Sequence, residues 1–308
     1  WATGRAGRGQ NPAESAVYSG SAGESLNQIR LAAQSRKGTP VITPPANRRS
    51  FVLATLLLTL LVTGCVTTTD SRFSREADQQ EALDNYVKLA TAYIGQGNLE
   101  RARHHLDRAL KLDSDDPGAR AAMGLVYNAE GEPELAERNF KQAISEDPGY
   151  TRARVYYGAF LFGQNRMEDA RDQFRAASRD TGYQDRGSVF FNLGMTQERL
   201  GELEAAATSY RRAVELTRGD ARSLLALSRV SVETGDYDDA ARYYSRLISL
   251  MQRNQRLVHS PESLLTGIRI ARFYSDENQE ASLALQLRNK FPESVEYQQY
   301  KVLISNGN

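Results

Sequence analysis

The chain has 308 residues, of which 25% are charged and 8% aromatic, and a formal net charge of +1 at pH 7. Residues 65–308 alone carry 39 − 7 = 32 basic and 38 − 2 = 36 acidic residues, a net charge of about −4. Nucleic-acid binding needs clustered positive charge, and no such cluster is present in the sequence. The single cysteine excludes an intrachain disulfide, so stability must come from packing.

Residues 1–40 are rich in Gly, Ser, Ala and Arg and have no apolar periodicity. We expect this stretch to be disordered or to be an over-extended translation. The second interpretation rests on the absence of any methionine before Met123. A start at Val41 from an alternative codon would leave a signal peptide of ordinary length.

Residues 41–64 have the features of a secretory signal peptide. Arg48 and Arg49 precede an apolar run from Phe51 to Val62. A transmembrane helix needs about 20 apolar residues, and this run is well short of that length. The run therefore predicts a segment that is recognised and removed rather than one that stays in the membrane.

The segment Leu61-Val62-Thr63-Gly64-Cys65 resembles the lipobox of bacterial lipoproteins. The resemblance implies cleavage before Cys65, a diacylglyceryl group on its thiol, and a further acyl chain such as palmitate on its new amino terminus. Two or more chains anchor a protein stably, whereas one does so only marginally. The alternative is a chance Gly-Cys pair after an apolar signal.

Val66 occupies the position where an Asp would resemble an inner-membrane retention signal. Its presence implies that the lipoprotein export and sorting machinery delivers the chain to the outer membrane, facing the periplasm. Residues 65–80 are short, polar and rich in Thr and Ser, so we expect a lipidated tether before the first packed helix.

From residue 81 to 304 a pattern of small and large residues recurs with a period of about 34 residues. It resembles the tetratricopeptide repeat, a helix pair in which small residues let helices A and B approach closely. This predicts an all-α, right-handed superhelical solenoid of about six helix pairs. The expected repeats span residues 83–116, 117–150, 151–184, 187–220 and 221–254, followed by a degenerate sixth repeat at 261–291 and a C-terminal helix at 292–304.

A turn glycine follows helix A in four of the repeats, where a left-handed backbone conformation is least costly without a Cβ atom. These glycines are Gly97, Gly131, Gly201 and Gly235. Asn165 takes their place in the third repeat, and asparagine tolerates the same conformation.

The sixth repeat is less regular than the others. Ser260 and Pro261 resemble a helix N-cap followed by a proline at the first helical position. We expect the turn of this repeat at Asn278 and its helix B from Glu280 to Lys290.

In such solenoids the A helices line a concave face, and projecting the repeat onto the sequence places a largely apolar row there. Such a row is a candidate groove for a partner helix or an extended peptide, although neighbouring repeats could bury some of its members. The Lys-x-x-x-Asn pattern that clamps a carboxylate is absent from the first repeat, so we expect mainly apolar contacts. The proposed groove comprises Val87, Ile94, Leu125, Asn128, Val155, Phe162, Phe191, Met195, Leu225 and Val232, with Thr91 and Ala159 beside them.

No catalytic or cofactor-binding motif is found in the sequence. His104, His105 and His259 do not have the spacing of a metal site. Acidic pairs such as Asp238-Asp239 fall in first helical turns, where the helix dipole explains them. We therefore expect no enzyme, no cofactor, no metal and no small-molecule substrate.

Three segments resemble the PilF/PilW family of type IV pilus biogenesis lipoproteins. They are Gly64-Cys65-Val66-Thr67 at the end of the signal, residues 267–272 and residues 285–298. The resemblance implies a pilotin, which carries secretin subunits to the outer membrane and promotes their multimerisation for pilus biogenesis and twitching motility. The main alternative is an outer-membrane repeat scaffold that recruits peptidoglycan hydrolases or other envelope enzymes.

Overall fold

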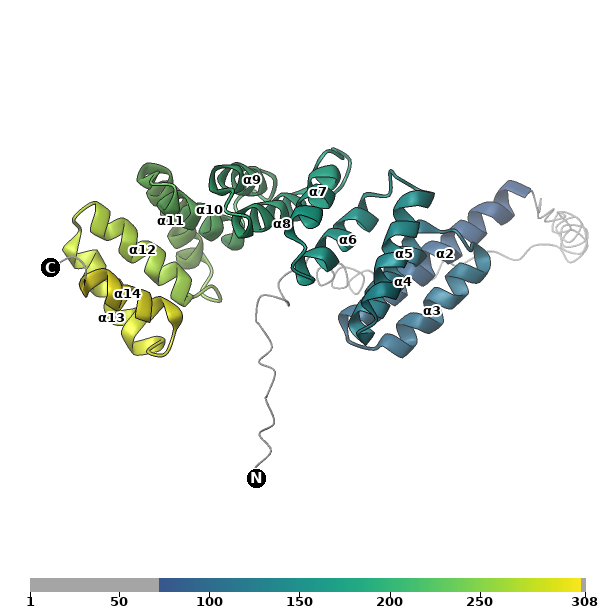
Figure 1. Cartoon of the computed structure of the whole chain (residues 1–308), viewed down its shortest axis with the longest axis horizontal. Helices are drawn as coiled ribbons and strands as arrows, with labels where there is room; N and C mark the ends of the chain where they lie inside the picture. Colours follow the sequence, from purple (N-terminus) through teal and green to yellow (C-terminus); the bar gives the residue numbers. More distant parts are fainter. Residues whose placement is uncertain (1–71, 306–308) are drawn as a thin grey trace, which may run out of the picture.

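The computed structural model describes residues 72–305, so the expected signal peptide, Cys65 and Val66 lie outside it. Within these residues the chain forms thirteen helices, which stack in consecutive pairs into an elongated array running from α2 to α14 (Figure 1). The prediction of an all-α array of tetratricopeptide repeats is confirmed. The pairs are α2 (Arg72–Gly95) with α3 (Leu99–Leu112), α4 (Pro117–Glu130) with α5 (Pro133–Glu146), α6 (Thr151–Gly163) with α7 (Met167–Ser178), α8 (Arg186–Arg199) with α9 (Leu203–Leu216), α10 (Ala221–Glu233) with α11 (Tyr237–Arg253), and α12 (Pro261–Phe273) with α13 (Glu277–Lys290), and they are followed by α14 (Val295–Ser305).

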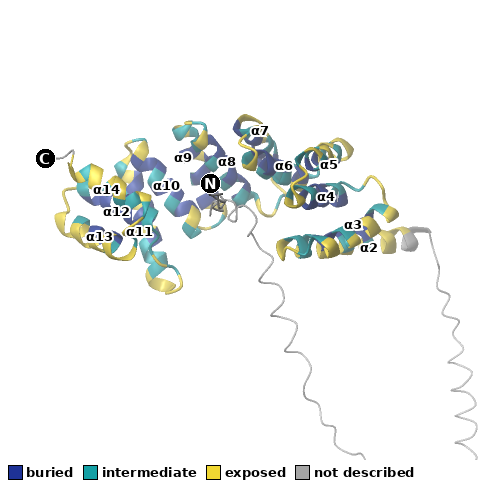
Figure 2. Cartoon of the chain, turned by 60° about the horizontal axis from the view of Figure 1, so that its bottom comes forward, coloured by how far each residue is buried: buried dark blue, intermediate teal, exposed yellow. Residues whose placement is uncertain are grey.

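Each helix pair is held by a large side chain of helix B that packs on a small residue of helix A. Phe140, Phe174 and Tyr210 are at most 1% exposed, and each lies against a glycine of the preceding helix A. A Cβ atom added to Gly158 would lie 2.9 Å from the ring of Phe174. The first pair instead combines Ala90 with Leu106, both fully buried. The buried residues follow the seams between helices (Figure 2).

The expected turn residues adopt the left-handed conformation. Gly97, Gly131, Gly201 and Gly235 have φ between 72° and 82°, and Asn165 has φ 59°. Each turn reverses the chain between the two helices of its pair. The turn positions predicted for the first five repeats are confirmed.

The turn of the sixth repeat was predicted wrongly. It lies at Ser275, which has φ 58°, and Asn278 lies inside α13. The carboxylate of Asp276 accepts a hydrogen bond from the backbone N–H of Gln279 at 3.0 Å, so α13 begins at Glu277 rather than at Glu280. The start of α12 agrees with the prediction, because the Ser260 hydroxyl accepts from the N–H of Ser263 at 3.1 Å and Pro261 follows it.

The ends of the array differ from the expected boundaries. Helix α2 begins at Arg72, so the last part of the range predicted as a tether is helical. Gln79 fixes this extension by donating its side-chain amide to the carbonyl of Leu112 at 3.0 Å. At the other end, α14 has no buried residue and packs on α12 and α13 only through half-buried side chains such as Tyr297 and Leu303.

An ion pair spans every junction between consecutive helix pairs. Exposed ion pairs contribute only about 0–1 kcal/mol each, so we assign these pairs mainly to orienting neighbouring repeats, with the less exposed Glu137 as the exception. From the first junction to the last, the pairs are Arg103 with Glu130, Arg166 with Glu137 at 2.9 Å, Arg171 with Glu202 at 2.5 Å, Arg211 with Asp239 at 2.8 Å, and Arg229 with Glu262 at 2.5 Å.

Glu137 is the most highly connected of these carboxylates. It accepts a hydrogen bond from the Tyr157 hydroxyl at 2.7 Å and pairs with Lys141 at 2.8 Å and with Arg166. Burial raises the pKa of Glu137, but the hydrogen bonds from Lys141, Tyr157 and Arg166 outweigh it and hold the pKa at about 2. The ionised carboxylate therefore stabilises the junction of the second and third pairs.

The glycine–aromatic contact predicts a specific coupling. Gly158→Ala should lower the melting temperature, because overpacking of a well-filled core costs about 1–3 kcal/mol and the helix propensity of alanine offsets only part of it. The double variant Gly158→Ala/Phe174→Leu reproduces the combination of Ala90 and Leu106. Its melting temperature should fall by less than the sum of the decreases in the two single variants. Additive melting temperatures would contradict the proposed contact.

The low pKa of Glu137 predicts a pH-dependent effect of its removal. Because the folded-state pKa is depressed, the stabilisation is present above the ordinary pKa of glutamate and is lost as pH falls toward 2. Urea unfolding gives the free energy of unfolding of the wild type and of Glu137→Gln. The difference between these two free energies should be smaller at pH 3.5 than at pH 7 by on the order of 1 kcal/mol. Glu81→Gln, an exposed substitution, is the control and should show no such narrowing.

Candidate functional site

The residues predicted to form the concave groove are less exposed than a free apolar strip would be. Val87 and Val232 are 8% exposed and Leu125 is 4% exposed, so these three belong to the core. The remaining members are half-buried. The row therefore presents the edges of its side chains and is partly filled by the repeats themselves.

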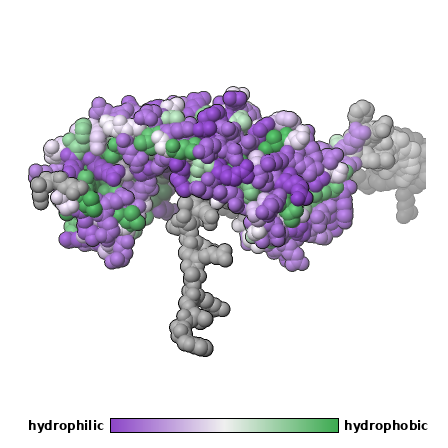
Figure 3. Space-filling view, in the orientation of Figure 1, coloured by the Kyte–Doolittle hydropathy of each residue, from purple (hydrophilic) through white to green (hydrophobic). Residues whose placement is uncertain are grey.

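Val87 packs in the core of the first helix pair, and the apolar members that follow it divide into two clusters. Ile94, Val155 and Phe162 pack with Leu125 on the core of the second and third pairs. Phe191, Met195 and Leu225 pack with Val232 on the core of the fourth and fifth pairs, which also includes Ile270 of α12. In the view of Figure 3, hydrophobic residues form small separate clusters on a mostly hydrophilic face. Asn128 follows Tyr127, which packs against the first cluster.

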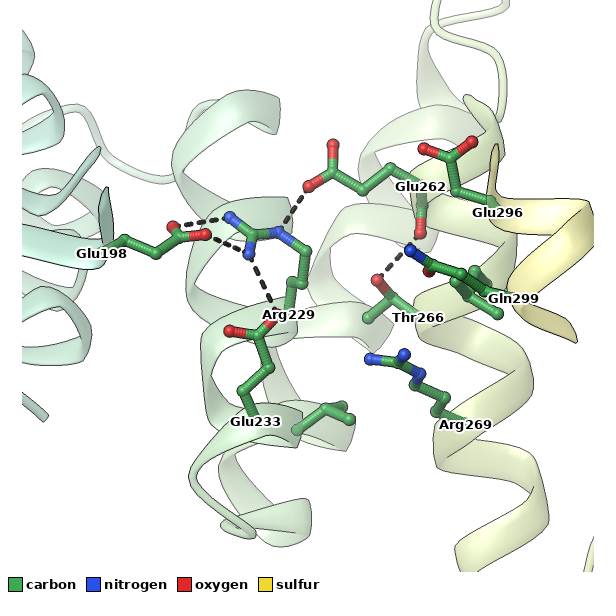
Figure 4. A pocket seen from close by; sticks show the side chains of 10 residues that line it. Glu198, Arg229, Glu233, Glu262, Thr266, Arg269, Glu296 and Gln299 are labelled. Carbon is green, nitrogen blue, oxygen red and sulfur yellow. Dashed lines mark hydrogen bonds and ion pairs between the residues drawn. The ribbon is translucent and has the colours of Figure 1, made fainter. Parts of the chain in front are cut away.

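A polar cavity of about 410 Å³ continues the site beyond the second cluster (Figure 4). It lies between α10, α12 and α14 and is reached by one residue of α8. Val232 belongs to both the apolar row and the cavity, so the two are contiguous. The cavity is lined by Glu198, Arg229, Val232, Glu233, Glu262, Leu265, Thr266, Arg269, Glu296 and Gln299.

Arg229 is the centre of the ion-pair network in this cavity. Its guanidinium binds Glu198 through two nitrogens, one of them 2.7 Å from the carboxylate, and contacts Glu233 at 3.3 Å and Glu262 at 2.5 Å. Burial lowers the pKa of Arg229, but the hydrogen bonds to Glu198 and the charges of Glu262 and Glu233 raise it well above its ordinary value. One arginine thus joins the fourth, fifth and sixth pairs.

Glu198 also accepts a hydrogen bond from a buried tyrosine of the core. The hydroxyl of Tyr210 donates to its carboxylate at 2.9 Å, and burial followed by the charge of Glu198 raises the pKa of Tyr210. Tyr244 is the equivalent of Tyr210 in the fifth pair, one repeat later, but Val232 stands where Glu198 would be. Its buried hydroxyl accordingly has no hydrogen-bond partner among the described residues.

Two charged residues of the cavity are not neutralised by ion pairs. Arg269 extends from α12 toward α10, and Glu296 reaches the cavity from α14 (Figure 4). Neither makes an ion pair within the part of the chain that the structure describes. The lining carries four carboxylates, from Glu198, Glu233, Glu262 and Glu296, against two guanidinium groups, a net charge of about −2.

Sequence reasoning missed this cavity for two reasons. The projected row ended at Val232 in the fifth repeat, so Leu265 and Arg269 of α12 lay outside it. Arg229 lies one repeat after Met195 and therefore at the same repeat position, but the prediction favoured apolar residues. A charged residue at an inward repeat position is the signal that would have identified the cavity.

His105 and His259 each contact a neighbouring side chain, whereas His104 is exposed. His105 stacks on Tyr93 with ring centroids 5.5 Å apart, and desolvation lowers its pKa. The Nδ1 atom of His259 lies 2.8 Å from the Ser263 hydroxyl. Over residues 72–305, no group of three or more His, Cys, Asp or Glu side chains could hold a metal ion. None of the helices in this range is long and apolar enough to cross a membrane.

Comparisons with known proteins agree with this architecture. Family models described as tetratricopeptide repeat match residues 81–116, 127–182 and 191–254. The chain is 33% identical over 246 residues to the type IV pilus assembly protein PilF of Pseudomonas aeruginosa, covering 80% of this chain and 95% of PilF.

Solved structures give the same result. The structure of P. aeruginosa PilF superposes with a TM-score of 0.65 at 32% identity, covering 73% of this chain and 99% of that one. The crystal structure of PilW, described as a widely conserved type IV pilus biogenesis factor, superposes with a TM-score of 0.58 at 24% identity, covering 71% and 97%. The second likeness supports the fold alone.

Proposed function

Because the chain belongs to the PilF/PilW family of tetratricopeptide-repeat proteins of type IV pilus assembly, we propose that it is an outer-membrane pilotin. It binds secretin subunits, brings them to the outer membrane and promotes their multimerisation. The observation that carries this proposal is the combination of a segment that ends at Cys65 and resembles a lipobox with a repeat array whose A helices present a row of apolar side-chain edges.

The lipid anchor determines where in the cell envelope the protein lies. Cys65 carries the acyl chains and Val66 directs sorting to the periplasmic face of the outer membrane. Two or more chains make the anchoring stable. A secretin subunit held by the array gains the membrane affinity of the anchor, because binding to a tethered partner raises its effective concentration at the surface.

The apolar row provides the surface that binds secretin. Phe162 lies in the first cluster and Phe191 in the second, and both are half-buried, so each presents part of its ring to a partner. Aromatic side chains of this kind contribute most to binding when a partner completes their burial. A secretin segment lying along the row would bury both rings at once.

Loss of the anchor should separate capture from delivery. In Cys65→Ala, detergent-resistant secretin multimers in outer-membrane fractions should fall to a small fraction of the wild-type level, because the bound subunits no longer have a membrane address. The purified variant should still capture secretin, since residues 72–305 are unchanged. Multimers of unchanged amount and location would contradict the proposed mechanism.

Charge placed in the row should weaken capture. Phe162→Asp and Phe191→Asp should each reduce secretin binding by roughly tenfold or more, since each removes an aromatic anchor and buries a carboxylate. Leu216→Asp is the matched control, because Leu216 is a 38% exposed apolar residue on the helix B α9. Circular dichroism checks that helicity is retained, and wild-type binding by both aromatic variants would place the site elsewhere.

A further inference from the structure

The cavity between α10, α12 and α14 has an unbalanced charge that the fold does not use. Arg229 satisfies both oxygens of Glu198 but only one oxygen each of Glu233 and Glu262. The side chains of Glu233 and Glu262 are 31% and 43% exposed, against 22% for Glu198. Negative charge in excess of that of Arg229 therefore remains accessible from the cavity.

The geometry restricts which cation could enter. Within residues 72–305 no set of three carboxylates is close enough together to hold a metal ion, although the cavity contains four. Its volume of about 410 Å³ lies in the range of sites that take small organic groups, about 300–1,000 Å³. A guanidinium or ammonium group on a flexible stem can contact carboxylates that are too far apart for a metal ion.

The position of the cavity indicates where that group comes from. Val232 lines both the cavity and the second apolar cluster, and Leu265 adds a further buried apolar wall at 5% exposure. A segment lying along the apolar row toward the C-terminal end would reach the cavity next. The stem of a lysine or arginine can pack on Val232 and Leu265 while its charged end reaches the carboxylates.

We propose that this cavity binds a basic side chain, lysine or arginine, of the secretin segment that occupies the apolar row. The inference rests on the proposed function and adds a partner requirement to it: apolar residues followed by a basic residue at the end that lies over α12. Glu233, Glu262 and Glu296 attract the basic group, and Arg269 opposes it. The cavity adjoins the row only through Val232, beyond the second cluster, so the basic residue must lie at that end of the bound segment, and this sets the direction of the segment.

The cavity can be tested with a pair of probes on the full lipidated chain in detergent. N-acetyl-arginine-N-methylamide carries the charge, and N-acetyl-citrulline-N-methylamide has nearly the same shape without it. Methyl NMR signals of Val232 and Leu265 should shift with the arginine probe and stay unmoved with the citrulline probe. Equal shifts with both probes, or none with either, would overturn the proposal.

Removing a carboxylate and removing a guanidinium from the cavity should change the affinity for the arginine probe in opposite directions. Glu233→Gln/Glu296→Gln should weaken arginine-probe binding by about tenfold, and Arg269→Gln should strengthen it severalfold, because each changes the Coulomb energy of a cation in the cavity. The weakening should diminish at high salt. Glu81→Gln/Glu204→Gln, at two exposed positions, is the matched control and should leave binding unchanged. A structural disturbance would weaken binding in every cavity variant, and that result would contradict a charge-based site.

Secretin capture separates this inference from the proposed function. Wild-type chain should capture secretin, and Glu233→Gln/Glu296→Gln should capture it with an affinity reduced by about tenfold. If the wild type captures secretin and the double variant captures it with the same affinity, the role of the cavity is overturned and the pilotin assignment stands. Absence of capture by the wild type would contradict the pilotin assignment itself.

Discussion

The structure depends on how closely the two helices of each pair approach one another. A buried aromatic ring of helix B fits against a residue of helix A that has no side chain, as Phe140 fits against Gly124 and Tyr210 against Gly194. This contact sets the separation of the helices, and the separation determines how one pair stacks on the next. The proposed groove of the A helices depends on that stacking, and therefore on contacts that lie beneath it.

The repeat pattern was sufficient to predict most of the fold, because glycine, alanine and aromatic residues at fixed spacing describe a packing arrangement directly. Prediction failed where the pattern was weakest. Ser275 adopts a left-handed conformation that sequence patterns assign to glycine or asparagine, and the nearby Asn278 was the more attractive choice. The N-cap Asp276 carried the correct signal, since its carboxylate fixes the start of α13.

The candidate site was only partly predictable. Repeat position identified which residues face inward, but it could not tell that Leu125 and Val232 are covered by neighbouring repeats while Phe162 keeps part of its surface. The charged cavity was out of reach for a related reason. Its carboxylates come from four helices, and only the stacking of the last three repeats and α14 brings them to one cavity.

The lipid anchor and the repeat array form two halves of one proposed device. Without the lipid anchor, the array would not bring its partner to the outer membrane. Without the array, the anchor would hold no specific partner there. The central claim is that the A helices hold the secretin. It is tested most directly by placing a photocrosslinking amino acid at Asn128 on the A helix α4 and, separately, at Lys141 on the B helix α5. We predict crosslinks to secretin from position 128 and none from 141, and crosslinks from 141 alone would contradict the account.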